Sequence, residues 1–241
     1  MSRAALALAL AALALSGCES TAEESARIER QTEAHRVQVH HTSLAARVAR
    51  QSTKVRVTSS ALLRSSEATA AVVDVRNTSS TPLRDIPIEL VVRGTNGASV
   101  YRNDTPGQAA SLVTIPLLAG HGTLDWIDDQ VQASATPVTV SARIGEGAPA
   151  RRAIPTISVR GRVTEEAGSQ AVSGEVFNHS PVEQRELVVY CVARRGARVV
   201  AAGRAVIPGA AANAPTRYEL FLEGNPAGAQ LQLSAPATTL G

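Results

Sequence analysis

Three carboxylates in one short segment have the spacing that comes closest to metal chemistry. Asp125, Asp128 and Asp129 flank Trp126, the single tryptophan of the chain. Calcium prefers carboxylate oxygens, but it takes about six to eight oxygen ligands, and this segment supplies too few. The other interpretation is the polar end of a strand in which Trp126 is the one large buried aromatic residue. We therefore expect no metal site. The alternative is a calcium site formed by Asp125, Asp128 and Asp129.

Thiol and imidazole groups give no catalytic set. Cys191 lies in the apolar run 187–193, where a lone cysteine without a neighbouring histidine or cation is most simply a small core residue. His35, His40 and His41 lack the four-residue spacing that places two metal ligands on one helix face, so we interpret them as solvated. The sequence has no glycine-rich phosphate loop, no His-Glu-x-x-His motif and no Gly-x-Ser-x-Gly elbow. We expect no catalytic residues, no cofactor and no enzymatic activity.

The other cysteine follows an export signal. Arg3 precedes an unbroken Ala/Leu run from Ala4 to Leu15, which is too short to span a bilayer core of about 30 Å. The residues Leu15-Ser16-Gly17-Cys18 resemble the lipobox of bacterial lipoproteins. This resemblance implies that the thiol of Cys18 receives a diacylglyceryl group and that cleavage falls between Gly17 and Cys18. It also implies an exported bacterial protein, anchored by lipid to the cell membrane or outer membrane and facing the periplasm or the exterior.

Composition limits the classes of partner. Hydrophobic residues make up 44% of the chain and charged residues 19%, which is typical of a globular protein. The net charge is +3, but Lys54 is the only lysine, and no basic stripe is interleaved with aromatic residues. We therefore expect no nucleic-acid binding. The pairs Arg151-Arg152 and Arg194-Arg195 are interpreted as solvated loop charge.

The elements that must position these residues change in character along the chain. After a signal peptide at 1–17, the segment 18–52 has Glu and Arg three and four residues apart, such as Glu23 and Arg27. This spacing favours a polar spacer that is either helical or disordered. From Lys54 the period becomes two, and short β-rich runs alternate with turn-forming residues. Such runs are typical of a small antiparallel β-sandwich, and we expect strands at 55–57, 70–75, 86–92, 111–118 and 138–142.

The second half of the chain repeats the order of the first. Its expected strands are 156–160, 171–177, 185–192, 197–202, 218–222 and 229–234. Three features recur in the same order: Asn77 with Asn178, Gly97 with Gly196, and 118–120 with 207–209. Matches at nearly constant separation predict a duplication. The expected domains are 53–147 and 155–241, two tandem antiparallel β-sandwiches joined by a linker at 148–154.

The second half carries the fuller version of this pattern, with its segments at 174–180, 196–200 and 208–209. A strand, an asparagine turn, a glycine turn and a closing strand in this order resemble the FxLYD-like domain of bacterial exported and lipid-anchored proteins. The first half has Val73 in place of a glycine of the pattern, and neither half has the signature that names the family. The resemblance implies immunoglobulin-like β-sandwiches that carry no catalytic residues.

Two classes of function fit this organisation. In the first, the sandwiches present loops or an edge strand to another protein of the bacterial cell envelope. In the second, they form a structural spacer or surface lipoprotein, and binding of a small ligand or calcium is a further alternative. We expect a lipid-anchored binding or assembly module outside the cytoplasm. Its expected partners are the membrane, through the lipid on Cys18, and another envelope protein.

Overall fold

Antiparallel β-strands make up nearly all of the regular secondary structure in the described chain, which confirms the predicted all-β class. The computed structural model describes residues 48–241 apart from 66–67, 105–107 and 167–168. The first half contains β1 (Val55–Arg64), β2 (Thr69–Asn77), β3 (Leu83–Gly94), β4 (Ser99–Arg102), η1 (Ala110–Leu112), β5 (Thr114–Leu118), β6 (Thr123–Asp128), β7 (Pro137–Ile144) and β8 (Ala148–Pro149). The second half contains β9 (Ile157–Glu166), β10 (Ser169–Asn178), β11 (Gln184–Arg195), β12 (Arg198–Ala210), β13 (Ala214–Phe221), β14 (Glu223–Gly224) and β15 (Gln230–Ser234). In these ranges no helix has the length and apolar character needed to cross a membrane.

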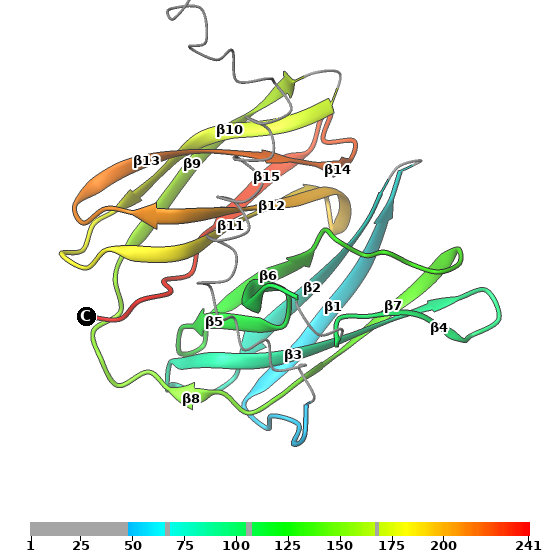
Figure 1. Cartoon of the computed structure of the whole chain (residues 1–241), viewed down its shortest axis with the longest axis horizontal. Coiled ribbons are helices and arrows are strands. Elements are labelled where there is room, and N and C mark those ends of the chain that lie inside the picture. Colours follow the sequence, from blue (N-terminus) through cyan, green and yellow to red (C-terminus); the bar gives the residue numbers. More distant parts are fainter. Residues whose placement is uncertain (1–47, 66–67, 105–107, 167–168) are drawn as a thin grey trace, which may run out of the picture. The chain divides into compact units, whose positions relative to one another are not determined.

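The first half consists of two sheets (Figure 1). One has the strand order β1-β2-β6. In the other, β3 is central, with β4 and β5 along one edge and β7 and β8 along the opposite edge. The twelve residues of β3 leave room for two short strands end to end on each side. Strands β4, β6 and β8 are absent from the predicted strand list, although the polar strand end expected around Trp126 lies in β6.

The second half also has two sheets, with the strand orders β13-β10-β9 and β14-β12-β11-β15 (Figure 1). Strands β9 and β10 pair continuously from Ile157 with Asn178 to Glu166 with Ser169. In this half, β9 and β12 continue furthest past their predicted ends. The strand expected at 156–160 continues to residue 166, and the one expected at 197–202 continues to residue 210.

The two halves share unusual backbone conformations at matching points. A positive φ is rare outside glycine, and the described chain has it at four other residues, which form two pairs. Asp85 (φ 51°) in β3 matches Glu186 (φ 50°) in β11, and His121 (φ 56°) matches Asn213 (φ 51°). Asp85 and Glu186 are each left out of the pairing with the neighbouring strand, and the register is the same before and after them. This matched pattern supports the predicted duplication.

The asparagine turn of the first half is held together by one buried side chain. The amide group of Asn77 donates hydrogen bonds to the carbonyls of Thr81 (2.8 Å), Leu118 (3.5 Å) and Ala119 (3.1 Å). Its Oδ1 accepts hydrogen bonds from the N–H and the hydroxyl of Ser79, at 3.0 and 2.8 Å. We call this set an asparagine clasp. It joins the β2–β3 turn to the end of β5.

The second half has the same asparagine clasp. Asn178 donates to the carbonyls of Val182 (2.8 Å), Ala210 (3.2 Å) and Ala211 (3.2 Å), and its Oδ1 accepts from the N–H and hydroxyl of Ser180. Leu118 and Ala119 are therefore matched by Ala210 and Ala211. The predicted alignment of 118–120 with 207–209 is wrong by three residues, because Pro208-Gly209 lies inside β12 and not at a turn.

Strand β11 is buried on both of its faces. Successive side chains of a strand point to opposite faces. Val188, Tyr190 and Val192 join the hydrophobic core of the first half, whereas the alternate residues Leu187, Val189, Cys191 and Ala193 join that of the second half. This double burial explains why the run 187–193 is apolar without interruption. The sheet that contains β11 and β12 thus packs against the first half as well as against its own partner sheet.

Ion pairs also connect the halves. Arg194 of β11 pairs with Asp74 (2.9 Å) and Asp125 (3.2 Å), and Arg204 of β12 pairs with Asp129 (2.8 Å). The interpretation of Arg194 as solvated loop charge is wrong, since only 16% of its side chain is exposed. All described residues belong to one compact unit. The division into separate domains at 53–147 and 155–241 stays a prediction, and the linker at 148–154 begins with β8, which pairs with β3.

Candidate functional site

The three carboxylates considered for calcium diverge instead of meeting. Asp125 and Asp128 lie an odd number of residues apart on β6, so strand alternation sends them to opposite faces. Each carboxylate has its own partner: Arg194 for Asp125, the Tyr101 hydroxyl for Asp128 and Arg204 for Asp129. No group of three His, Cys, Asp or Glu side chains in the described chain is placed to hold a metal ion. The segment makes internal polar contacts and no common ligand set.

Asp128 is the most buried of these acids, with no exposed surface. Burial raises the pKa of Asp128 above its usual range, and the hydrogen bonds from the Tyr101 hydroxyl (2.7 Å) and the Gln130 N–H (2.9 Å) oppose this rise. Burial also raises the pKa of Tyr101, whose hydroxyl accepts a hydrogen bond from Gln108 (3.2 Å). These contacts satisfy the carboxylate within the first half.

The raised pKa of Asp128 predicts a pH dependence of stability. A carboxyl with a higher pKa in the folded than in the unfolded state stabilises the fold below its unfolded pKa of about 3.9, and this contribution is lost as the pH rises through the folded pKa. We therefore expect the parent to gain free energy of unfolding relative to Asp128→Asn as the pH falls from 7 to about 4. Urea denaturation across this range measures it. Tyr101→Phe should enlarge the change, because it removes a hydrogen bond that lowers the pKa, and a difference independent of pH would contradict the prediction.

Cys191 and Trp126 are core residues, as predicted. Both are fully buried, and burial raises the pKa of the Cys191 thiol to about 12, which keeps the thiol neutral. The indole N–H of Trp126 donates to the carbonyl of Ser111 (3.1 Å). Trp126 is not the only large buried aromatic residue, because Tyr190 is also buried, with only 1% of it exposed.

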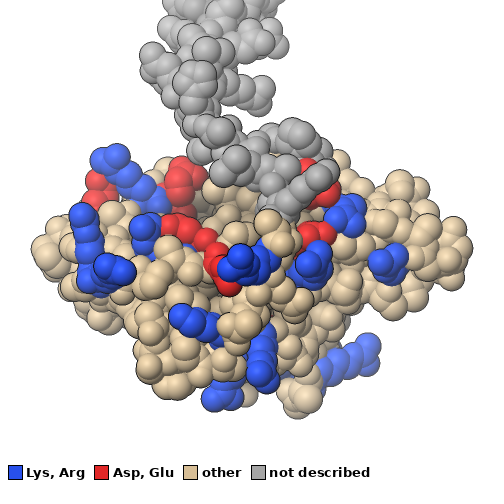
Figure 2. Space-filling view, turned by 90° about the horizontal axis from the view of Figure 1, so that it is seen from below, with Lys and Arg blue, Asp and Glu red and all other residues tan. Residues whose placement is uncertain are grey.

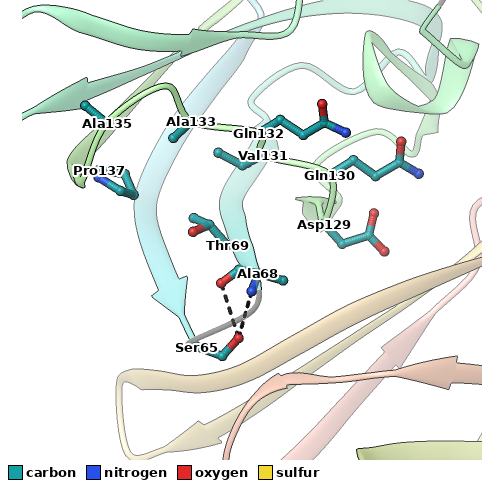
Figure 3. A pocket seen from close by; sticks show the side chains of 10 residues that line it. All are labelled: Ser65, Ala68, Thr69, Asp129, Gln130, Val131, Gln132, Ala133, Ala135 and Pro137. Atoms are coloured by element: carbon teal, nitrogen blue, oxygen red, sulfur yellow. Dashed lines mark hydrogen bonds between the residues drawn. The ribbon is translucent and has the colours of Figure 1, made fainter.

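A groove of about 520 Å³ lies beside the end of the β1–β2 hairpin (Figure 3). One side is formed by Ser65, Ala68 and Thr69, and the other by residues between 129 and 137. Among the described residues that line it, only Asp129 is ionisable, and Asp129 pairs with Arg204. The groove therefore offers neither a nucleophile with a base nor a set of metal ligands.

Arginine side chains gather on the outer face of the β13-β10-β9 sheet. The register places Arg160, Glu175 and Arg217 in one row across the three strands. The next row contains Arg162, Ser173 and Glu219. Arg160 pairs with Glu175 at 2.5 Å. This bond, with a smaller effect of Arg217, holds the pKa of Glu175 below its usual range. We call Arg160, Arg162 and Arg217 the arginine face.

A shallow hollow of about 730 Å³ lies between the two rows of the arginine face. Its floor is backbone, because strand alternation turns Gly161, Gly174 and Tyr218 toward the inner face. There the Tyr218 hydroxyl donates to the Arg160 carbonyl (3.2 Å), and a Cβ on Gly161 would lie only 2.5 Å from that hydroxyl. Arg162 and Arg217 have no salt bridge or hydrogen bond to other described side chains. These two guanidinium groups can therefore contact an anionic partner, although Glu175 and Glu219 lie on the same face.

The arginine face was not among the predicted functional residues. The strand predicted at 156–160 ends before Arg162. The signal is nevertheless present in the sequence. The run 159–163 alternates Val, Arg, Gly, Arg and Val, which is the period of a strand with one basic face.

Basic side chains elsewhere are more scattered. Figure 2 shows one face of the molecule, on which Lys and Arg side chains are separated by uncharged surface and stand beside acidic groups in places. Arg151 and Arg152 are exposed and lie between β8 and β9, which confirms their interpretation as loop charge. This face has no continuous basic stripe of the kind that tracks a nucleic-acid backbone.

The export and lipidation residues lie outside the described part of the chain. This applies to the signal peptide at 1–17, to Gly17 and Cys18 at the predicted cleavage site, and to most of the spacer at 18–52 with its histidines. Comparisons with protein-family models and with curated proteins find no match to the chain. The lipobox and FxLYD-like resemblances therefore stay predictions.

Proposed function

We propose that this chain is a bacterial lipoprotein that acts without catalysis, as a binding or assembly module in the cell envelope. In this proposal the lipid on Cys18 anchors it to the cell membrane or outer membrane, and the β-sandwiches, FxLYD-like and immunoglobulin-like, face the periplasm or the exterior. A second envelope protein binds at the arginine face.

The observation that supports this proposal is the arginine face itself. Arg162 and Arg217 project from the outer face of a regular sheet without a salt bridge to described residues. Close by on the same sheet, Phe221 is 55% exposed. Arginine and aromatic side chains are enriched in the parts of interfaces that contribute most to binding. Asp125, Asp128 and Asp129 instead have partners within the fold, and the Cys191 thiol is buried.

The anchoring part of the proposal predicts the effect of Cys18→Ser. Without the thiol no thioether to diacylglycerol forms, so we expect the variant to move from the membrane fraction to the soluble fraction. Fractionation of cells that express the parent or the variant, followed by immunoblotting, measures this change. Washing with high salt separates lipid anchoring from electrostatic attachment. A variant that remains in the salt-washed membranes would show that Cys18 is not the anchor.

The binding part is tested by photo-crosslinking in living cells of the native host. A photoreactive phenylalanine analogue at Phe221 lies on the same face as the arginines, and the same analogue at Val138, which is 50% exposed on β7, is the matched control. We expect one recurrent envelope protein from the Phe221 probe and none from the Val138 probe. Diffuse crosslinks from both positions would favour the spacer function.

A further inference from the structure

The edge of β9 that faces away from β10 is open. Strand β9 pairs with β10 along its whole length without a bulge, and no other strand of the described chain pairs with it. Such an edge presents a row of backbone N–H and C=O groups on which another strand can pair. Extended segments of partner proteins bind to sheet edges in this way.

The matching strand of the first half, β1, has a covered edge. The Ser60 hydroxyl donates to the Val140 carbonyl (3.1 Å), and the Arg64 guanidinium donates to the Pro137 carbonyl (2.9 Å), so both bonds tie β1 to β7. Strand β1 also contains a bulge, and bulges at edges oppose unwanted pairing. In the described chain no hydrogen bond joins β9 to β15, the strand that matches β7. The same edge is thus protected in one half and available in the other.

The apolar layer beneath β9 is also incomplete at this edge. Val163, Val172 and Leu220 form one row across the inner face of the sheet. Val172 and Leu220 are almost fully buried, whereas 39% of Val163 is exposed. An added strand with an aliphatic side chain beside Val163 would extend the layer and remove this surface from water.

The outer face of β9 selects the charge of an added strand. Arg160 and Arg162 lie two residues apart and therefore on the same face. The side chain of Arg160 is 83% exposed although it pairs with Glu175. Carboxylates directly across from these two guanidinium groups would form charge-assisted hydrogen bonds. The matching segment therefore has acidic side chains at alternate positions and aliphatic side chains between them.

A second copy of β9 does not meet this requirement. Two β9 strands could pair antiparallel over nearly their full length, with their outer faces on the same side. An arginine of one copy would then lie opposite an arginine of the other. Like charges directly across from each other destabilise a strand pair. The occupant that fits is a segment of a different protein.

We propose that the free edge of β9 binds, by strand addition, an extended segment of a partner protein in which acidic and aliphatic residues alternate. The acidic side chains lie across from Arg160 and Arg162, and an aliphatic side chain lies beside Val163. This inference rests on the proposed function and names the chemistry of the partner at the same sheet.

The probe for this site is an octapeptide of alternating Glu and Val that carries a fluorophore. Its binding to the full chain, purified in detergent, is measured by fluorescence anisotropy. We expect it to bind at least about tenfold more tightly than an octapeptide of alternating Lys and Val. Two N-methylated forms of the Glu-Val peptide are also tested, one methylated at the Val amides and one at the Glu amides. Because only alternate N–H groups of an added strand face β9, one of the two forms should lose binding as well.

Charge reversal in the protein completes the test. The double variant Arg160→Glu/Arg162→Glu should lose at least about tenfold in affinity for the Glu-Val peptide and should gain affinity for the Lys-Val peptide. The matched control is Arg56→Glu/Arg76→Glu, which reverses two exposed arginines that pair across β1 and β2, next to the covered edge. This control should bind the Glu-Val peptide like the parent. Circular dichroism confirms that each variant keeps its strands.

The outcomes separate the inference from the proposed function. Failure of the Glu-Val peptide to bind, or unchanged binding of both of its N-methylated forms, overturns strand addition at β9. An unchanged affinity in Arg160→Glu/Arg162→Glu overturns the assignment of the two arginines. If a partner is still crosslinked from Phe221 in cells, the proposed function stands and only the inference fails. If no partner is crosslinked there and the peptide does not bind, both fail.

Discussion

Tyr190→Ala is expected to lower the free energy of unfolding by roughly 3–5 kcal/mol, the usual cost of removing a large buried aromatic side chain. The ring belongs to β11 in the second half, but it packs in the hydrophobic core of the first half, and only 1% of it is exposed. The cavity left by alanine would therefore weaken the contact between the halves. We expect the first half to lose stability although the substitution is in the second.

Trp126 makes this expectation measurable. It is the only tryptophan of the chain and lies in β6, so its fluorescence during urea denaturation reports on the first half. With Cys18→Ser in every variant to prevent lipidation, we expect the fluorescence and circular dichroism transitions of Tyr190→Ala to move together to lower urea. An unchanged Trp126 midpoint would contradict the shared core and favour two independent domains.

Tyr190→Phe is the control for the loss of the ring. The Tyr190 hydroxyl is buried and has no hydrogen-bond partner in the described chain. A buried polar group without a partner costs stability, so its removal is expected to leave the free energy of unfolding unchanged or to raise it by about 1 kcal/mol. A loss as large as that of Tyr190→Ala would mean that the hydroxyl, and not the ring, holds the two halves together.

The strands of this fold could be predicted wherever local pattern decides them. The runs that became β2, β3 and β11 are rich in β-branched residues and end at turn-formers such as Asn77 and Gly196, so their type and order follow from the sequence. Strand β6 was expected only as a polar strand end around Trp126, because Asp125, Asp128 and Asp129 interrupt its apolar pattern. The partners of these acids lie elsewhere in the sequence, as Arg204 does from Asp129 at 75 residues. No local pattern encodes such a pairing.

The candidate site was predictable only in part. An edge strand was expected as a means of binding, but which strand has a free edge depends on the presence of covering contacts such as that of Arg64 with Pro137. Those contacts join residues 73 positions apart. The turn role of Asn77 was predicted from its own segment, whereas its bonds to Leu118 and Ala119 reach across 41 and 42 residues. Sequence pattern identifies residues suited to a role, and tertiary pairing decides which copy performs it.

Asn178→Ala is expected to cost roughly 3–5 kcal/mol, because it leaves several buried polar groups of one asparagine clasp without partners. The amide of Asn178 is the donor to the carbonyls of Val182, Ala210 and Ala211, and its Oδ1 holds Ser180. Alanine supplies neither donor nor acceptor. Urea denaturation measures the loss. Ser180→Ala removes the hydroxyl that bonds to Asn178 Oδ1, to the Val182 carbonyl and to the Val182 N–H. Because the amide of Asn178 keeps its own bonds, this variant should cost less, about 1–2 kcal/mol.

Asn77→Ala tests whether the first asparagine clasp contributes as much as the second. Asn77 is equally buried and makes the corresponding hydrogen bonds, so we expect a loss within about 1 kcal/mol of that for Asn178→Ala. The two clasps share no residue, and for this reason their costs should add in the double variant. A loss below about 1 kcal/mol in either single variant would mean that water or another donor satisfies the freed carbonyls. The clasp would then guide the path of the chain without contributing much to its stability.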